Sequence, residues 1–195
     1  RPGLGIWYRS GYEEKDVVDY NTHNLKLNAA IHYKITPKIE AVVSSNFGNG
    51  TTVYQGDNRY SLKDIYFYQQ KIEVKQEDKF FIRAYTTSED AGNSYDAFVT
   101  ALLLQTSAKS DSRWAQDYSN HWNTTYRPKV NALPESYTQL QSQYPNYSDY
   151  VNAINPWLLE MYPDSLYKYH DETRAYTDQT VSIAGQYARF EPGTA

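Results

Sequence analysis

The chain has 195 residues, a formal net charge of −4, and no cysteine. This length allows one domain or slightly more, the lack of cysteine excludes disulfides and thiolate metal sites, and the acidic balance disfavours a nucleic-acid partner. The mean hydropathy is −0.78, and no apolar run approaches the ~20 residues that a membrane-spanning helix needs.

Residues 1–24 are expected to form a loop with one short strand. The strand would be Ile6-Trp7-Tyr8-Arg9, because three of these four residues are large and apolar or aromatic. Residues 11–24 carry many acidic side chains and have no apolar period, which is typical of a loop.

Residues 25–87 alternate between apolar and polar side chains. Strict alternation predicts strands with one face in each of two media, and a strand that crosses a bilayer has roughly 9–11 residues. Tight breaks at residues 36–38 and 76–78, and a longer polar loop at 48–60, separate the runs. Two hairpins are predicted, from the runs Leu25–Ile35, Ile39–Phe47, Leu62–Val74 and Lys79–Thr87.

Two folds fit these runs: a sheet packed on the core of a soluble protein, as in a sandwich, or consecutive strands of a membrane barrel. Two features favour the barrel, because a barrel has a polar lumen and aromatic girdles at both interfaces. One face is rich in polar side chains: Lys26, Asn28, His32, Lys34, Lys63, Gln69, Lys71 and Glu73. Aromatic residues gather near the strand ends: Tyr33, Phe47, Tyr60, Tyr66, Phe67, Tyr68, Phe80, Phe81 and Tyr85.

Residues 88–195 are predicted to be mostly helical. Ser94 would cap a helix over 95–104, with a fifth strand as the alternative, and Asp111 or Ser112 would cap the next helix. Further helices are expected at 134–143, 148–155, 157–162 and 164–175, punctuated by prolines, with a loop from 179 onward. The predicted fold class is therefore a fragment of a transmembrane antiparallel β-barrel, about four strands, plus a helical extracellular loop region.

No motif of an enzyme, metal site or cofactor site is present, so no catalytic activity and no cofactor are predicted. The four histidines are scattered, and none forms a zinc-protease motif. Trp114, Trp122 and Trp157, with neighbouring tyrosines, are candidates for a surface that contacts a ligand or partner. The favoured alternative for these tryptophans is packing within the helical region, because short helices need tertiary contacts.

Several segments together resemble a known family. They are NLKLNAAIHY (24–33), YQGDNRYSL (54–62) and FIRAYTTSEDAGNSYD (81–96), joined by WAQDY (114–118) and RFEPGT (189–194). The chain resembles TonB-dependent outer-membrane receptors of Bacteroidetes, the relatives of SusC-like transporters. The resemblance implies a barrel of about 22 strands with a plug. Because four or five strands cannot close such a barrel, the chain is expected to be an internal piece of a longer receptor.

The resemblance also implies a function. Such receptors import a glycan, peptide or metal chelate, are energised through TonB by other parts of the receptor, and often pair with a SusD-like surface lipoprotein. The chain would lie in the bacterial outer membrane in contact with its lipid, with residues 88–195 extracellular, shaping substrate entry or docking the lipoprotein. A soluble aromatic-rich binding module is the main alternative, and a hydrolase with a dispersed site is the weakest.

Overall fold

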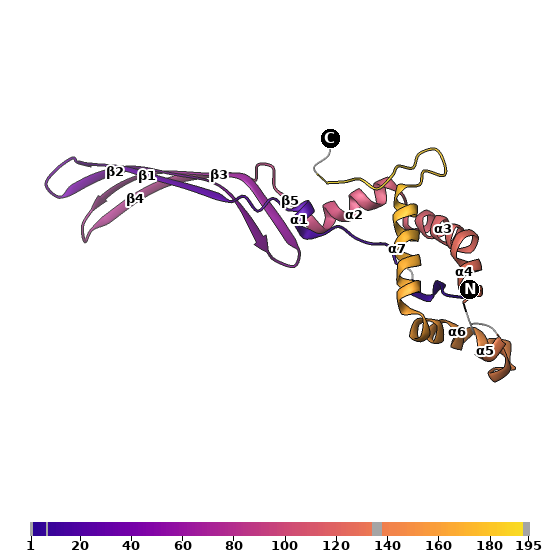
Figure 1. The fold of residues 1–195 in the computed structure, drawn as a ribbon. Coiled ribbons are helices and arrows are strands. Elements are labelled where there is room, and N and C mark those ends of the chain that lie inside the picture. The colour runs from indigo at the N-terminus through magenta and orange to yellow at the C-terminus, as the bar shows by residue number, and fades with distance from the viewer. Residues whose placement is uncertain (1, 7, 134–137, 193–195) are drawn as a thin grey trace. The chain divides into compact units, whose positions relative to one another are not determined.

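The computed structural model describes residues 2–6, 8–133 and 138–192. The chain forms two compact units (Figure 1). The sheet unit is Tyr12–Ala101, and the helical unit joins Arg1–Gly11 to Leu102–Ala195. This division differs from the predicted segments 1–24, 25–87 and 88–195, because the first eleven residues belong with the helices.

The sheet unit contains one open antiparallel sheet in the order β1-β2-β3-β4. The strands are β1 (His23–Lys34), β2 (Ile39–Gln55), β3 (Arg59–Gln76) and β4 (Phe80–Asp90), and a two-residue β5 (Tyr95–Asp96) also pairs with β3. The two predicted hairpins are confirmed, since consecutive strands are neighbours joined by short connections.

The predicted polar loop at 48–60 is wrong. β2 and β3 continue through it, with Thr52 opposite Leu62 and Tyr54 opposite Tyr60, and only Gly56–Asn58 remain as the connection. Gly and Asn have low strand propensity, but pairing with a neighbouring strand overrides propensity here. The connections therefore do not differ in length as the sequence suggested.

A β-bulge interrupts β3 opposite the Gly50–Thr52 step of β2. Asp64 at the bulge has a φ of 54°, and a Cβ on Gly92 would lie 2.2 Å from the Asp64 carbonyl oxygen, so that approach requires glycine. Lys63 lies beyond the bulge and is offset from the row of polar residues in which the sequence placed it. Its Nζ instead pairs with Asp19 at 3.2 Å.

The helices are α1 (Glu14–Val17), α2 (Ala97–Ala108), α3 (Asp111–His121), α4 (Arg127–Asn131), α5 (Thr138–Gln143), α6 (Tyr147–Met161) and α7 (Pro163–Gln179), with a π-helical turn η2 (Trp122–Tyr126) and a 3₁₀ turn η1 (Leu4–Ile6). Helices are found near each predicted range, but the predicted helices 148–155 and 157–162 are one helix, α6, and α1 and α4 were not predicted. Residues 134–137 of the predicted helix 134–143 lie outside the described residues. The core of the helical unit comprises Trp122, Tyr126, Val130, Leu140, Tyr150, Ile154, Leu158 and Leu166.

Three helix-boundary predictions are corrected. Asp96, not Ser94, accepts the hydrogen bond from the Val99 backbone N–H at 3.0 Å that caps α2, and Ser110 caps α3. α6 does not stop before Pro156. The helix passes through this proline because Ile154 and Leu158, on either side of it, are both buried in the core, and this packing outweighs the lost backbone hydrogen bond.

The N-terminal segment is built into the helical unit. The Gly3 N–H donates to Asn155 Oδ1 at 2.8 Å, and the Arg9 guanidinium donates to the carbonyls of Lys109 and Gln105, both at 2.8 Å. The predicted strand at residues 6–9 is not found: η1 ends at Ile6, Tyr8 and Arg9 have no regular structure, and Trp7 lies outside the described residues. The sheet is thus an insertion between two parts of the helical unit.

Within the described residues, no helix combines the length and apolarity that crossing a membrane requires.

Candidate functional site

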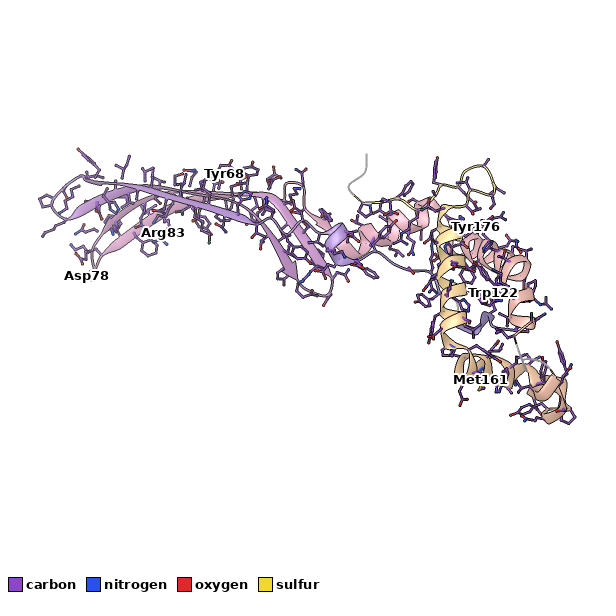
Figure 2. The ribbon with its side chains drawn as sticks, viewed as in Figure 1. Tyr68, Asp78, Arg83, Trp122, Met161 and Tyr176 are labelled. Atoms are coloured by element: carbon purple, nitrogen blue, oxygen red, sulfur yellow. The ribbon has the colours of Figure 1, made fainter. Side chains whose placement is uncertain are left out.

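The register divides the side chains of the sheet between two chemically different faces, because residues directly opposite one another point to the same side. The apolar face carries Leu25, Leu27, Ala29, Ile31, Tyr33, Ala41, Val43, Phe47, Tyr66, Tyr68, Ile72, Val74, Phe80 and Ile82. The polar face carries Asn24, Lys26, Asn28, His32, Lys34, Glu40, Asn46, Gln69, Lys71, Glu73, Lys75, Arg83 and Glu89, and also Val42, Ile65, Phe67, Phe81 and Tyr85. Phe67, Phe81 and Tyr85 therefore do not belong to the aromatic girdle that the sequence predicted. Tyr68 and Arg83 represent the two faces in Figure 2.

The apolar face is open to its surroundings. Ile31 is 73% exposed and Ile82 is 70% exposed, values that are unusual for aliphatic side chains in a folded protein. No second layer of the sheet unit covers them. A polar row of Ser45, Gln70 and Thr86 crosses this face, and the apolar residues on either side of the row form a patch larger than the scattered apolar residues of ordinary surfaces.

Two aromatic bands bound the apolar face. Phe47, Tyr66 and Tyr68 form one band, with the rings of Phe47 and Tyr68 5.1 Å apart. The other consists of two residues on the edge strands, Phe80 opposite Gln76 and Tyr33 opposite Ala41. From Tyr68 to Gln76 along β3 is roughly 26 Å at about 3.3 Å per residue. Ile72 and its cross-strand partners Val43 and Ile31 lie midway between the bands.

The polar face is crowded and internally paired. Glu40 accepts from His32 at 3.1 Å and from Lys75 at 3.2 Å, and Glu73 forms an ion pair with Arg83. Glu73 is only 6% exposed, although no other layer of its unit covers it. The side chains of this face therefore cover one another, as expected on the inner side of a curved sheet.

A hollow of about 930 Å³ lies on the sheet toward the end where β1 begins and β4 ends. Most of the residues that line it are on the polar face: Asn24, Lys26, Asn28, Asn46, Gly48, Gly50, Ile65, Phe67 and Glu89. The hollow thus belongs to the polar face. Of the three β2 residues of that face that line the hollow, Gly48 and Gly50 carry no side chain, and the third is Asn46.

The sequence does not predict this hollow. Its composition predicts a loop at Gly48 and Gly50 and an interfacial aromatic residue at Phe67. The register brings Lys26, Gly48, Phe67 and Glu89 into one row across four strands. The available signal was the continued alternation beyond Phe47, which the glycines and asparagines obscured.

The three tryptophan candidates do not form a common surface. Trp114 is 1% exposed and Trp122 is 0% exposed, with their Nε1–H groups donating to Asp178 Oδ1 at 2.7 Å and to the Pro2 carbonyl at 3.2 Å. Trp157 is partly buried against the core. Their positions agree with the alternative of core packing, because a side chain with no accessible area contacts no external ligand.

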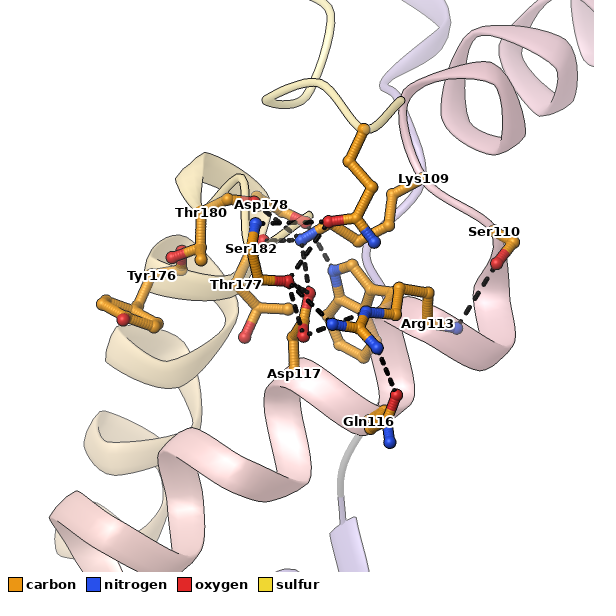
Figure 3. A network of polar contacts seen from close by, with 12 residues as sticks. Lys109, Ser110, Arg113, Gln116, Asp117, Tyr176, Thr177, Asp178, Thr180 and Ser182 are labelled. Carbon is orange, nitrogen blue, oxygen red and sulfur yellow. Dashed lines mark hydrogen bonds and ion pairs between the residues drawn. The ribbon is translucent and has the colours of Figure 1, made fainter. Parts of the chain in front are cut away.

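A buried polar network holds the end of the helical unit together (Figure 3). The Lys109 ammonium donates to Asp117 Oδ2 at 3.0 Å and to the carbonyls of Thr177 and Thr180 at 2.9 and 2.8 Å. Ser182 also donates to Asp117, at 3.0 Å. All three ammonium donors of Lys109 are used, so the network fastens residues 177–182 to α3 and leaves no group for chemistry.

His170 occupies a second buried position in the helical unit. Its Nε2–H donates to the Gly3 carbonyl at 2.7 Å, so Nδ1 is the acceptor for the Tyr118 hydroxyl. Burial lowers the pKa of His170 and raises the pKa of the Tyr118 hydroxyl. Both groups are therefore neutral near pH 7, and neither lines a hollow.

The described residues contain no group of three or more His, Asp or Glu side chains that could hold a metal ion. Comparison of the chain with protein-family models, with curated proteins and with solved structures gives no match.

Proposed function

We propose that β1–β4 are membrane-spanning strands in the wall of a TonB-dependent, SusC-like outer-membrane transporter that imports a nutrient. The apolar face contacts lipid and the polar face lines the solute channel. The observation that carries this proposal is the exposed apolar face, bounded by two aromatic bands and backed by a face of charged and amide side chains. Membrane β-barrels combine these features.

The exposure of the apolar face supports a lipid environment over a soluble one. Fully burying one Ile, Leu or Phe side chain is worth about 1.5–3 kcal/mol, and Ile31, Ile72 and Ile82 forgo most of that stabilisation in water. A bilayer removes the cost without a second protein layer. A soluble binding module would instead need another layer across this face.

The topology supports a common outer side for both parts of the helical unit. β1 starts and β4 finishes at the same end of the sheet, opposite the turns at residues 35–38 and 77–79. Residues 2–11 and 102–192 therefore leave the sheet from one end, and they fold together. In the proposed transporter this unit lies outside the cell, where it shapes substrate entry or docks a surface lipoprotein.

The free edges of β1 and β4 are consistent with the same function. Their outward N–H and C=O groups would be unsatisfied in lipid, and only closure into a barrel removes such edges. The proposed transporter closes the barrel with further strands on both sides.

Neighbouring substitutions on the two faces test the proposal. Ile31→Arg places a charge at the middle of the lipid-facing belt, and its expected cost in bilayer folding is about 2–4 kcal/mol. Ala30→Arg, one residue away on the polar face, is the matched control and should fold like the parent. Folding into lipid vesicles is measured by urea titration of the whole protein.

Two results would contradict the proposal. One is equal folding of Ile31→Arg and Ala30→Arg in vesicles, because opposite faces would then share one environment. The other is a whole protein from its native source that stays soluble and monomeric without detergent, which would favour the soluble binding module.

A further inference from the structure

We propose that the hollow on the polar face binds a short peptide with a free ammonium and a free carboxylate, the carboxylate at Lys26 and the ammonium at Glu89. The inference rests on the proposed function in one respect, since it takes the polar face as the wall of the solute channel. It specifies the substrate class of that channel. Binding itself is measurable without a membrane.

The first support is the pairing of charges on the polar face. Toward the turns, Glu40 and Glu73 are both ion-paired, with Lys75 and Arg83 respectively. At the hollow, by contrast, the carboxylate of Glu89 has no ion pair or side-chain hydrogen bond to any described residue. Lys26, across the hollow, has none either, as is also the case for Lys34 and Lys71 of the same face. Two opposite charges thus line one hollow with their pairing capacity unused.

The second support is the distance between these charges. Lys26, Gly48, Phe67 and Glu89 lie in one row, so the outer two are separated by three strand spacings, about 14 Å between Cα atoms at roughly 4.8 Å each. An extended peptide spans about 3.3–3.6 Å per residue. An extended peptide of about two to four residues is long enough to reach from one charge to the other.

The third support is the space over Gly48 and the exposed ring of Phe67, which lie between Lys26 and Glu89 in the row. Gly48 leaves space above β2, since a Cβ built there meets nothing closer than Phe67 Cβ at 3.7 Å. Phe67 is 39% exposed and lies beside that space. An apolar side chain of the peptide packs on this ring. The Asn28 and Asn46 side chains also line the hollow, but the Asn28 amide donates to Asn46 Oδ1 and the Asn46 amide donates to Gln69 Oε1 at 2.9 Å, so the contacts to the peptide come from Lys26, Glu89 and Phe67.

Calorimetric binding of the tripeptide Ala-Phe-Ala to the whole protein in detergent tests the inference. Lys26→Gln and Glu89→Gln should each weaken binding about tenfold, as expected for losing one charge-assisted hydrogen bond. Amidating the peptide carboxylate should weaken binding to the parent but not to Lys26→Gln. Acetylating the peptide amine should weaken binding to the parent but not to Glu89→Gln.

Two further variants fix the location. Gly48→Leu should abolish binding, because its side chain fills the hollow without a backbone clash. Lys71→Gln, on the same face but four residues nearer the turn along β3, should bind like the parent. A peptide blocked at both ends that binds as tightly as the free peptide would overturn the inference, as would absence of binding by every peptide.

The two proposals fail separately. If no peptide binds but Ile31→Arg and Ala30→Arg still differ in vesicles, the peptide site is wrong and the membrane assignment stands. If peptide binding follows Lys26 and Glu89 but the two arginine variants fold equally, the site stands and the membrane assignment is wrong.

Discussion

The helical unit buries a core of large side chains, whereas the sheet presents one whole face of mostly apolar side chains outward. Trp114, Tyr118 and Trp122 are buried, but Leu27, Ile31 and Ile82 on the sheet are mostly exposed. The helical unit thus has the hydrophobic core that folding in water requires. The sheet has cross-strand pairing but no core on its apolar side, so its stability depends on what covers that side.

The two units also differ in their tryptophan content, which decides what fluorescence can report. All four tryptophans, Trp7, Trp114, Trp122 and Trp157, fall within the helical unit. Tryptophan fluorescence during urea unfolding therefore reports the helical unit, and bilayer folding assays report the sheet.

The largest expected effect is on the buried ion pair of the helical unit. Asp117→Ala leaves the Lys109 ammonium buried with only carbonyl partners, and the expected loss of unfolding free energy is about 3–5 kcal/mol. Urea unfolding followed by tryptophan fluorescence measures it. The control is Glu13→Ala, which breaks an exposed pair with Lys15 in the sheet unit and should leave that transition unchanged. A loss as small as that of the control would show that the network is not structural.

A matched pair of apolar truncations contrasts the two units directly. Leu158→Ala, in the core of the helical unit, should destabilise it by about 2–5 kcal/mol. Ile82→Ala, on the open face of the sheet, should cost much less in detergent-free urea unfolding followed by far-ultraviolet circular dichroism, which reports the strands as well as the helices, because little buried contact is lost. Equal costs would mean that a protein layer covers the apolar face of the sheet.

A smaller effect is expected from a single hydroxyl group. The Tyr126 hydroxyl donates to Glu172 Oε2 at 2.5 Å. Burial, and to a smaller extent this hydrogen bond, raise the pKa of Tyr126 to about 12. Tyr126→Phe should lower stability by about 1 kcal/mol. The comparison variant Tyr85→Phe, at an exposed tyrosine of the sheet, should change nothing. Equal shifts in the two variants would contradict the assigned hydrogen bond.

The smallest expected effect is the contribution of His170 to the pH dependence of stability, and it does not appear at neutral pH. His170 has a lowered pKa because it is buried, so the unfolded chain binds its proton more readily than the folded one. Stability of the helical unit is therefore unaffected above the unfolded value of about 6.5 and declines as pH falls below it. His170→Gln should flatten the fall in urea midpoint between pH 7 and 5. His121, whose pKa burial also lowers, supplies a residual slope, and an unchanged slope in His170→Gln would exclude His170 as the main source.

Parts of the fold were predictable because they depend on local periodicity. The alternation from Leu25 to Tyr33 placed one face of β1 correctly, and the helix after Asp96 was predicted in place of a long fifth strand. The extension of β2 past Phe47 was not predictable from propensity, since its residues are held by partners in β3. The predicted helix end at Pro156 was wrong for a similar reason, since contacts on both sides of the proline keep α6 continuous.

The candidate site was less predictable than the fold. Lys26 was assigned to the polar face from its position in the alternation, but its row with Gly48, Phe67 and Glu89 depends on register. The tryptophans were recognisable as important, but whether they lay inside or outside a core depended on contacts among α3, α6, α7 and the N-terminal segment.

By itself the sequence determined the period of each segment, and hence that the strands have an apolar and a polar face and that helices follow them. Only the tertiary structure decided which residues share a row, that glycines open a hollow on the polar face, and that residues 2–11 complete the helical unit. The physical reason is the separation along the chain of the residues that interact. Periodicity acts between residues two to four positions apart, whereas register, bulges and burial arise from pairings between residues that are distant in the chain.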